Sequence, residues 1–478
     1  MTETGKAAVR AQFNHAEEVP PLVESDARPG DQRLSDLTET VLDDIEVTED
    51  GVAREFVRRY GNRVRFDHVA GKWFLWTGDH WKKDDTAQAF QWSRELARQA
   101  STGSGGSELK NARKASFAGG VERLARADQA VAITSEAWDS DPMLLGCPGG
   151  VVDLTTGQLA GAQPSQHITK VAGVPPVDGR CDRWQAFLMA ATGGDEDAVH
   201  FLQVWCGYLL TGKTTEHVLL FLYGPGGNGK SLFLNIIKRV LGDYAKTAGM
   251  DTFTATRGER HPTDLADLHG ARLVSASETE EGRSWAESRI KSITGGDPVS
   301  ARFMRSDFFT YTPNYKLMIV GNHQPVLKSV DEAIRRRFLI LPFTRKPDRP
   351  DLDLEEKIWA EEAPQILAWA IRGCLEWQRE GLPRPRLISA ATDQYFEDQD
   401  LFGAWLADYC EVGDLTNSET AADLFVSWKF FCEAAGERPG TQKALGNRLR
   451  LKGLTNGPKR VGGKVQKVWL GILLKGGV

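Results

Sequence analysis

Residues 224–231 read Gly224-Pro225-Gly226-Gly227-Asn228-Gly229-Lys230-Ser231, and every position fits the pattern G-x-x-x-x-G-K-[ST]. An apolar, β-rich run at 217–223 precedes this stretch, and a helical run at 232–241 follows it. In this context the glycines let backbone N–H groups turn inward around a phosphate, Lys230 supplies a charge to the β and γ oxygens, and Ser231 offers an oxygen to Mg²⁺. The pattern favours a nucleoside triphosphate site over a glycine-rich turn with a solvated lysine. A kinase, a GTPase, a packaging motor and a helicase all remain open.

A second β-like run, 271–278, ends in carboxylates about fifty residues after this loop. Mg²⁺ needs oxygen ligands and an attacking water must be oriented, so a carboxylate on a strand next to the loop's strand could serve both needs. We expect Glu278 to be this carboxylate, with Glu280 as the second choice. An ordinary acidic loop is the alternative.

Residues 316–323 form a third apolar run with a polar end, where Asn322 could hold the γ-phosphate or the attacking water. The segment 331–338 then places consecutive arginines ahead of a further apolar run, 338–343. A guanidinium delivered to the γ-phosphate of a neighbouring subunit would stabilise the transition state. Arg336 and Arg337 are the candidates, although arginine runs are more often solvated faces.

Short apolar runs alternate with helical segments between 218 and 343, which is typical of an open α/β sheet. The chain has 478 residues, enough for about three domains. We predict an α/β protein with an N-terminal mixed α/β module, a P-loop core and a C-terminal winged-helix domain. The expected boundaries are a disordered acidic tail at 1–45, an accessory module at 46–175, a helical linker at 176–215, an ATPase core at 216–345, a helical connector at 346–400 and a DNA-binding domain at 401–478.

The two ends of the chain differ in charge, although the formal net charge is only −6. Residues 1–50 contain thirteen acidic and four basic side chains, whereas 438–478 contain ten basic and no acidic ones. Helical spacing followed by a glycine-rich basic hairpin resembles a recognition helix and wing, which would bring phosphate-seeking side chains onto one face. The candidates for duplex contact are Lys443, Arg448, Arg450, Lys459, Arg460 and Lys464. A basic surface that only keeps the domain soluble is the alternative.

Six cysteines are scattered without a C-x-x-C pair, so neither a zinc ribbon nor a disulfide framework is indicated. No apolar run of about 18 residues occurs, and the N-terminus lacks the order of a signal peptide. We therefore expect a protein of the cytoplasm, without a membrane partner.

The motifs in this order resemble those of superfamily 3 helicases of the D5 or phage-P4-like primase/helicase family. The likeness is carried by GPGGNGKS at 224–231, SASETEEGR at 275–283, IKSITGGDPVSARFM at 290–304, GNHQP at 321–325 and DEAIRRRFLILPF at 331–343. Upstream, 61–81 and 148–159 look like the module that precedes the helicase in this family.

The resemblance implies an AAA-like ring, a homo-hexamer, that uses ATP and Mg²⁺ to move 3′ to 5′ along single-stranded DNA in a bacterial host. Lys230 and Ser231 match the Walker A residues, Glu278 the Walker B acid and Asn322 the sensor 1 asparagine, while Arg336 and Arg337 match the arginine-finger region. The family's DNA-gripping hairpin points to Arg302, Met304 and Arg305, with Lys291 nearby and a plain charged hairpin as the alternative.

Many relatives carry a polymerase-type primase domain further upstream, and the 45 or so residues before the module are too few for one. We therefore expect priming to come from a separate primase or polymerase. Two other functions compete with a replicative helicase of a phage, plasmid or integrated element. One is a replication initiator that binds DNA and uses ATP only for assembly, and the other is a viral packaging or RNA-directed NTPase.

Overall fold

The computed structural model of the chain describes residues 45–255, 263–278, 284–303, 307–327, 331–414, 416–436, 438–461 and 464–475. The predicted acidic tail therefore lies outside the described residues, except for residue 45. The chain divides into two compact units, one including 45–59 and 90–125 and the other including 60–89 and the residues from 126 onward. Residues of the predicted accessory module, 46–175, occur in both units.

The first unit is helical. It contains most of α2 (Glu49–Tyr60) and α3 (Gln88–Ala100), together with α4 (Gly106–Ala112) and α5 (Ala115–Ala125). Helix α2 begins with acidic residues and ends with basic ones, in the orientation that the helix dipole favours. Its buried face carries Val52 and Phe56, and that of α5 carries Phe117 and Val121. Helices α3 and α4 flank the Gly/Ser-rich segment that begins at residue 101.

Two small sheets open the second unit. The first has the order β3-β2-β1-β4, formed by β1 (Val64–Asp67), β2 (Lys72–Trp76), β3 (Trp81–Lys83) and β4 (Ala132–Ile133). The second is an antiparallel meander of β5 (Leu144–Cys147), β6 (Gly150–Asp153) and β7 (Gln158–Ala160). Gly149, with φ of +87°, allows the tight turn between β5 and β6. Strands β5 and β6 thus form a hairpin around this turn.

A five-stranded parallel sheet forms the centre of the second unit, with the order β14-β8-β13-β10-β9. Its strands are β8 (Leu219–Tyr223), β9 (Ala245–Thr247), β10 (Leu273–Glu278), β13 (Lys316–Gly321) and β14 (Phe338–Pro342). Leu220 and Leu222 pack into one hydrophobic core, whereas Leu219 and Phe221 pack into another. Both faces are therefore covered, which explains why these strands read as continuous apolar runs.

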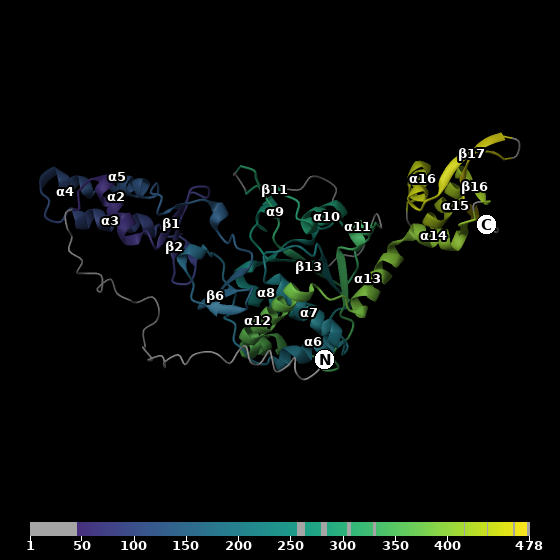
Figure 1. Cartoon of the computed structure of the whole chain (residues 1–478), viewed down its shortest axis with the longest axis horizontal. Helices are drawn as coiled ribbons and strands as arrows, with labels where there is room; N and C mark the ends of the chain where they lie inside the picture. Colours follow the sequence, from purple (N-terminus) through teal and green to yellow (C-terminus); the bar gives the residue numbers. More distant parts are fainter. Residues whose placement is uncertain are drawn as a thin grey trace. The chain divides into compact units, whose positions relative to one another are not determined.

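The helices on the two faces come from different parts of the chain (Figure 1). One core includes residues of α6 (Asp182–Ala191), α7 (Glu196–Leu209), α8 (Lys230–Leu241) and α12 (Leu354–Glu380). The other includes residues of α10 (Glu287–Gly295) and α13 (Arg386–Gln399). The predicted open α/β sheet is confirmed.

One expectation about this sheet is wrong. We expected the strand that ends at Glu278 to lie next to the strand that leads into the loop at 224–231. Strand β13 lies between them and pairs in parallel with both β8 and β10. A parallel crossover can leave room for a later strand, so the order of strands along the chain does not fix their order in the sheet.

The C-terminal residues form helices and small sheets around a core of their own. They comprise α14 (Leu401–Tyr409), β15 (Cys410–Val412), β16 (Ser418–Thr420), α15 (Ala421–Ala434), α16 (Gln442–Leu451), β17 (Thr455–Val461), β18 (Lys464–Leu470) and β19 (Ile472–Leu474). Trp405, Trp428, Leu449 and Trp469 are buried in this core. The predicted helices and hairpin are present. Across the described part of the chain, no helix is both long and apolar enough to cross a membrane.

Candidate functional site

The loop at 224–231 joins the end of β8 to the start of α8, as its sequence context predicts. Gly227 and Gly229 have φ of +80° and +89°, in the left-handed region that favours glycine. A Cβ at Gly229 would also lie only 2.6 Å from the ring of Phe187. The loop therefore needs glycine at position 229 for its backbone conformation and for its packing.

Lys230, at the start of α8, is only 5% exposed. Its Nζ donates to the carbonyl oxygens of Gly224 (2.5 Å) and Pro225 (2.9 Å) and to Oδ1 of Asn228 (2.9 Å). Burial, and to a lesser extent the charge of Lys346, lowers the pKa of Lys230. The loop thus holds this ammonium group among its own oxygen atoms.

The strands end in one row at the edge of the sheet where this loop begins. Glu278 of β10 pairs in register with Gly321 of β13, Gly321 with Tyr223 of β8, and Tyr223 with Pro342 of β14. Asn322 follows β13 directly and is exposed. With neighbouring strands about 4.8 Å apart, the backbone of Glu278 lies roughly 10 Å from that of Tyr223. The side chain of Glu278 and all of Glu280 lie outside the described residues.

The three consecutive arginines have different surroundings. Arg335, the last residue of α11 (Glu332–Arg335), pairs with Asp393 at 2.7 Å. Arg337 donates to the hydroxyl of Thr294 (3.1 Å) and to the carbonyl of Ala333 (2.5 Å). The guanidinium of Arg336 is exposed and has no hydrogen-bond partner within the described part of the chain. Of the three arginines, Arg336 is thus the one whose guanidinium lacks a hydrogen-bond partner among the residues that the structure describes.

The segment predicted to form a DNA-gripping hairpin contains β11 (Val299–Ala301) and β12 (Phe309–Tyr311), which pair antiparallel. Arg302 is half-buried, with its guanidinium 4.8 Å from the ring centroid of Phe308. Lys291, on α10, forms an ion pair with Asp331 at 2.5 Å and so is engaged within the chain. Met304 and Arg305 lie outside the described residues.

The basic residues predicted for the C-terminal domain lie on α16 and on the hairpin β17–β18. Exposed side chains are found at Lys443, Arg448, Arg450, Lys459 and Arg460. Three of them also contact neighbours: Arg448 lies over Trp428, Arg450 over Trp469, and Lys459 donates to the Ser418 hydroxyl at 2.7 Å. Lys464 begins β18, and its side chain lies outside the described part.

Sequence reasoning missed two features around the loop. Asn228 was named only as a motif position, yet its amide also donates to the carbonyl of Phe343, which follows β14. Lys346 brings a second positive charge close to Lys230. Its signal in the sequence was its place shortly after the last apolar run, since the ends of parallel strands meet at one edge of a sheet.

Two family models match the chain. The family described as D5 N terminal like matches residues 53–193, and a family of unknown function (DUF5906) matches residues 222–337. The second range includes the loop at 224–231, Glu278, Asn322 and the three arginines.

Curated viral proteins are similar over part of their length. Protein L207/L206 of Acanthamoeba polyphaga mimivirus, named as a helicase candidate, is 25% identical over 57% of this chain and 31% of its own length. Protein 022R of Frog virus 3, named in the same way, is 24% identical over 58% of this chain and 30% of its own. Primase D5 of Fowlpox virus is 26% identical over 27% and 17%. The chain thus spans less than a third of these relatives.

Among solved structures, the apo C-terminal region of NrS-1 is 12% identical and covers 88% of this chain and 99% of its own, with a TM-score of 0.48. The two family models, one on each side of residue 200, and the viral relatives named for helicases and primases agree with the order of motifs along the chain. These matches support the D5-type primase-helicase family for this chain.

Proposed function

We propose that this chain is the ATP-driven motor of a superfamily 3 DNA helicase. The observation that carries the proposal is the row of strand ends at one edge of the central sheet. There the loop at 224–231, Asn322 and Glu278 follow three parallel strands whose last residues are in register. Ligands of α/β sheets commonly bind at the carboxyl ends of the strands, so the groups needed to bind and cleave a triphosphate would meet at this edge.

The loop suits the phosphates of ATP in its charge and its backbone. Lys230 is surrounded by three neutral oxygens, for which phosphate oxygens could substitute. The loop opens α8, a helix of 12 residues whose first N–H groups favour an anion. Ser231, exposed in the first turn of α8, and Glu278 would hold Mg²⁺, which would neutralise charge on the phosphates.

The reaction would divide among three side chains of this chain. Lys230 would stabilise the negative charge on the β and γ phosphate oxygens as the γ-phosphoryl group leaves. Asn322 would orient the attacking water, and Glu278 would accept its proton. Because Glu278 stands two strands away from β8, it is better placed for the water than for the β-phosphate.

A shared active site would make the chain an oligomer, which we propose to be a homo-hexamer. Arg335 and Arg337 are bound within the chain, whereas the Arg336 guanidinium is exposed. Arg336 is thus the residue that we assign to the γ-phosphate of a neighbouring subunit. We assign single-stranded DNA to the ring pore, and duplex DNA to the C-terminal domain as a winged helix built from α15, α16 and β17–β18.

A replication initiator is the second candidate function. The basic side chains on α16 and β17–β18 favour it, because they would bind duplex DNA whether or not ATP drives unwinding. An initiator would bind duplex DNA in a salt-dependent manner and need ATP only to assemble.

Strand displacement separates the two functions. The chain is incubated with ATP and either a forked duplex or a blunt duplex of the same sequence, and Lys230→Ala serves as the inactive control. A helicase releases the labelled strand of the fork only, and Lys230→Ala releases none. Duplex binding and ATP-dependent assembly without strand release on either substrate would favour the initiator.

A further inference from the structure

A cavity of about 710 Å³ lies outside the proposed ATP site. Four lysines line it, Lys82, Lys83, Lys170 and Lys246. They come from β3, from the segment that follows residue 167, and from β9 at the edge of the central sheet. We call this cavity the lysine groove. Its lining includes residues from the range that matches the D5 N terminal like family and residues from the range that matches DUF5906.

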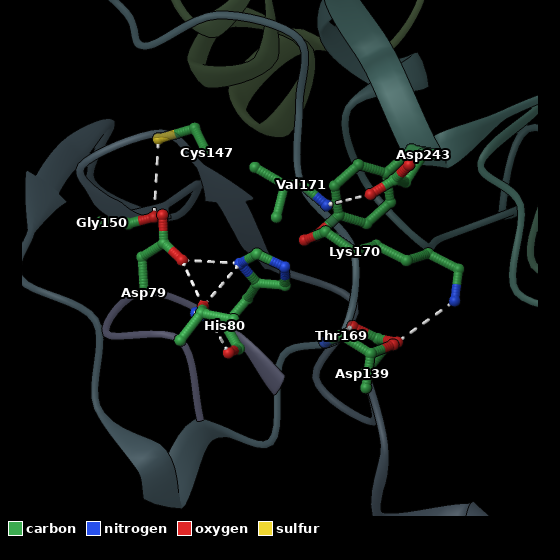
Figure 2. Close-up of polar contacts among 11 residues, drawn as sticks. Asp79, His80, Asp139, Cys147, Gly150, Thr169, Lys170, Val171 and Asp243 are labelled. Atoms are coloured by element: carbon green, nitrogen blue, oxygen red, sulfur yellow. Dashed lines mark hydrogen bonds and ion pairs between the residues drawn. The ribbon is translucent and has the colours of Figure 1, made fainter. Parts of the chain in front are cut away.

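Hydrogen bonds to backbone groups hold together the segments that line the lysine groove. The N–H of Trp81 donates to the carbonyl of Ile168 at 2.7 Å, which joins β3 to the segment that follows residue 167. On the other side, the N–H of Val171 donates to Asp243 Oδ2 at 3.1 Å, and the hydroxyl of Tyr244 donates to the Lys170 carbonyl at 3.0 Å. Figure 2 shows Lys170 and Val171 beside Asp243. The groove is therefore built into the second unit.

The charges in the lysine groove leave cations unpaired. Lys83 pairs with Asp85 at 2.9 Å, and Lys170 with Asp139 at 3.2 Å (Figure 2). Lys82 and Lys246 have no acidic partner among the described residues. The lining also contains two carboxylates, Asp243 and Asp267, and in the part of the chain that the structure describes neither forms an ion pair with a lysine. Asp243 accepts the N–H of Val171 instead. The groove thus favours an extended anion whose negative charges can contact more than one lysine.

An exposed aromatic ring completes the lining. Phe303 is 47% exposed and lines the groove, and its ring stacks on Phe309 with centroids 5.4 Å apart. Cations along a groove together with an accessible ring are what proteins use to hold unpaired strands, because phosphates meet the cations and bases stack on the ring. The volume lies in the range of small-ligand sites, so it accommodates a few nucleotides and not a duplex.

We propose that the lysine groove binds an unpaired DNA strand, with Lys82 and Lys246 on its phosphates and Phe303 stacked on a base. The groove would carry the strand between β3 of the N-terminal module and the hairpin β11–β12. This inference rests on the proposed function only in taking DNA as the substrate, and it assigns the N-terminal module a direct part in strand binding.

The test measures binding of a labelled oligothymidylate to the full chain without ATP, by fluorescence anisotropy over a range of salt concentrations. Lys82→Gln/Lys246→Gln removes two phosphate contacts, so the slope of log K against log salt should become shallower by about 1.4. Lys110→Gln/Lys114→Gln is the matched control, because both lysines are exposed and neither lines the groove. It should leave the slope unchanged. Phe303→Ala should weaken binding about tenfold at an unchanged slope, and Phe303→Trp should restore it.

Several results would overturn the proposal. Equal losses in the two double variants would mean that only net charge matters. An unchanged slope in Lys82→Gln/Lys246→Gln, with thermal unfolding like that of the parent, would exclude the groove as the binding site of the strand. If the groove variants lost affinity only for free nucleotide or for duplex DNA and kept their affinity for the oligothymidylate, the groove would bind a different ligand. Because this binding assay contains no ATP, it tests the groove separately from ATP turnover. If the parent chain bound the strand through the groove but released no phosphate in a separate assay with ATP, the proposed function would be refuted and this inference would stand.

Discussion

Asn228 connects Lys230 to the strand next to the loop's own strand: its Oδ1 accepts from the Lys230 ammonium at 2.9 Å, and its Nδ2 donates to the carbonyl of Phe343. The side chain is 3% exposed, so water cannot readily replace either contact. The amide therefore fixes the position of Lys230 relative to β14. The variable x positions of the motif leave this residue type open, so only the structure reveals its role.

Asn228→Ala should therefore impair ATP binding through a misplaced Lys230 and also destabilise the fold. Loss of a buried hydrogen-bonding group that leaves its partners unsatisfied costs about 1–3 kcal/mol. Asn235→Ala is the control, since Asn235 lies on α8, the helix that begins at Lys230, and donates to Glu355 at 3.0 Å in a half-buried position. Urea unfolding and the KM for ATP give the readouts. A KM for Asn228→Ala equal to that of the control would show that the asparagine does not position Lys230.

Glu278→Gln should bind ATP with nearly unchanged affinity and hydrolyse it about 10²–10⁴-fold more slowly, because glutamine cannot accept the proton of the attacking water. Binding is followed with a fluorescent ATP analogue, and hydrolysis by phosphate release. Glu280→Gln is the control, and we expect it to retain turnover. Should Glu278→Gln keep normal turnover while Glu280→Gln loses it, the assignment would move to Glu280.

Lys316 gives a prediction for pH dependence. This lysine begins β13, and burial, with a smaller contribution from Arg272, lowers its pKa well below 10.5. Between the folded pKa and 10.5 the unfolded chain binds more protons than the folded one, so this group makes the free energy of unfolding rise with pH. The gain between about pH 7 and about pH 9 should therefore be smaller in Lys316→Met than in the parent.

Lys357→Met is the matched control for this measurement, because Lys357 is half-exposed and pairs with Asp351 near the surface. Urea unfolding at both pH values gives the difference in stability for each protein. An identical gain in the parent and in Lys316→Met would mean that Lys316 remains charged in the folded state.

The sequence predicted the apolar strands well and their arrangement less well. Runs such as 219–223 and 338–342 are β-rich and apolar because both faces of the sheet are covered, so the strand at each of them was predictable. The place of β13 between β8 and β10 depends on the path of the chain in space, which no local pattern encodes.

The candidate site also contains features that could be predicted from the sequence and features that could not. The glycines and Lys230 are recognisable because backbone conformation and phosphate charge restrict the residue types that fit. The difference among Arg335, Arg336 and Arg337 could not be predicted, because it depends on Asp393 and Thr294, which are far away in sequence. Likewise, nothing local to Lys291 indicates that it pairs with Asp331.

Arg336→Ala should lower ATP turnover by about 10³–10⁵-fold, the contribution of an arginine finger, while unfolding stays like that of the parent because the side chain is exposed. Arg335→Ala is the control: it breaks a surface ion pair with Asp393 and should affect turnover little. Mixing Arg336→Ala with Lys230→Ala should restore part of the activity, because some interfaces then combine an intact Lys230 with an intact Arg336. If subunit exchange is demonstrated and the mixture stays inactive, Arg336 does not act between subunits.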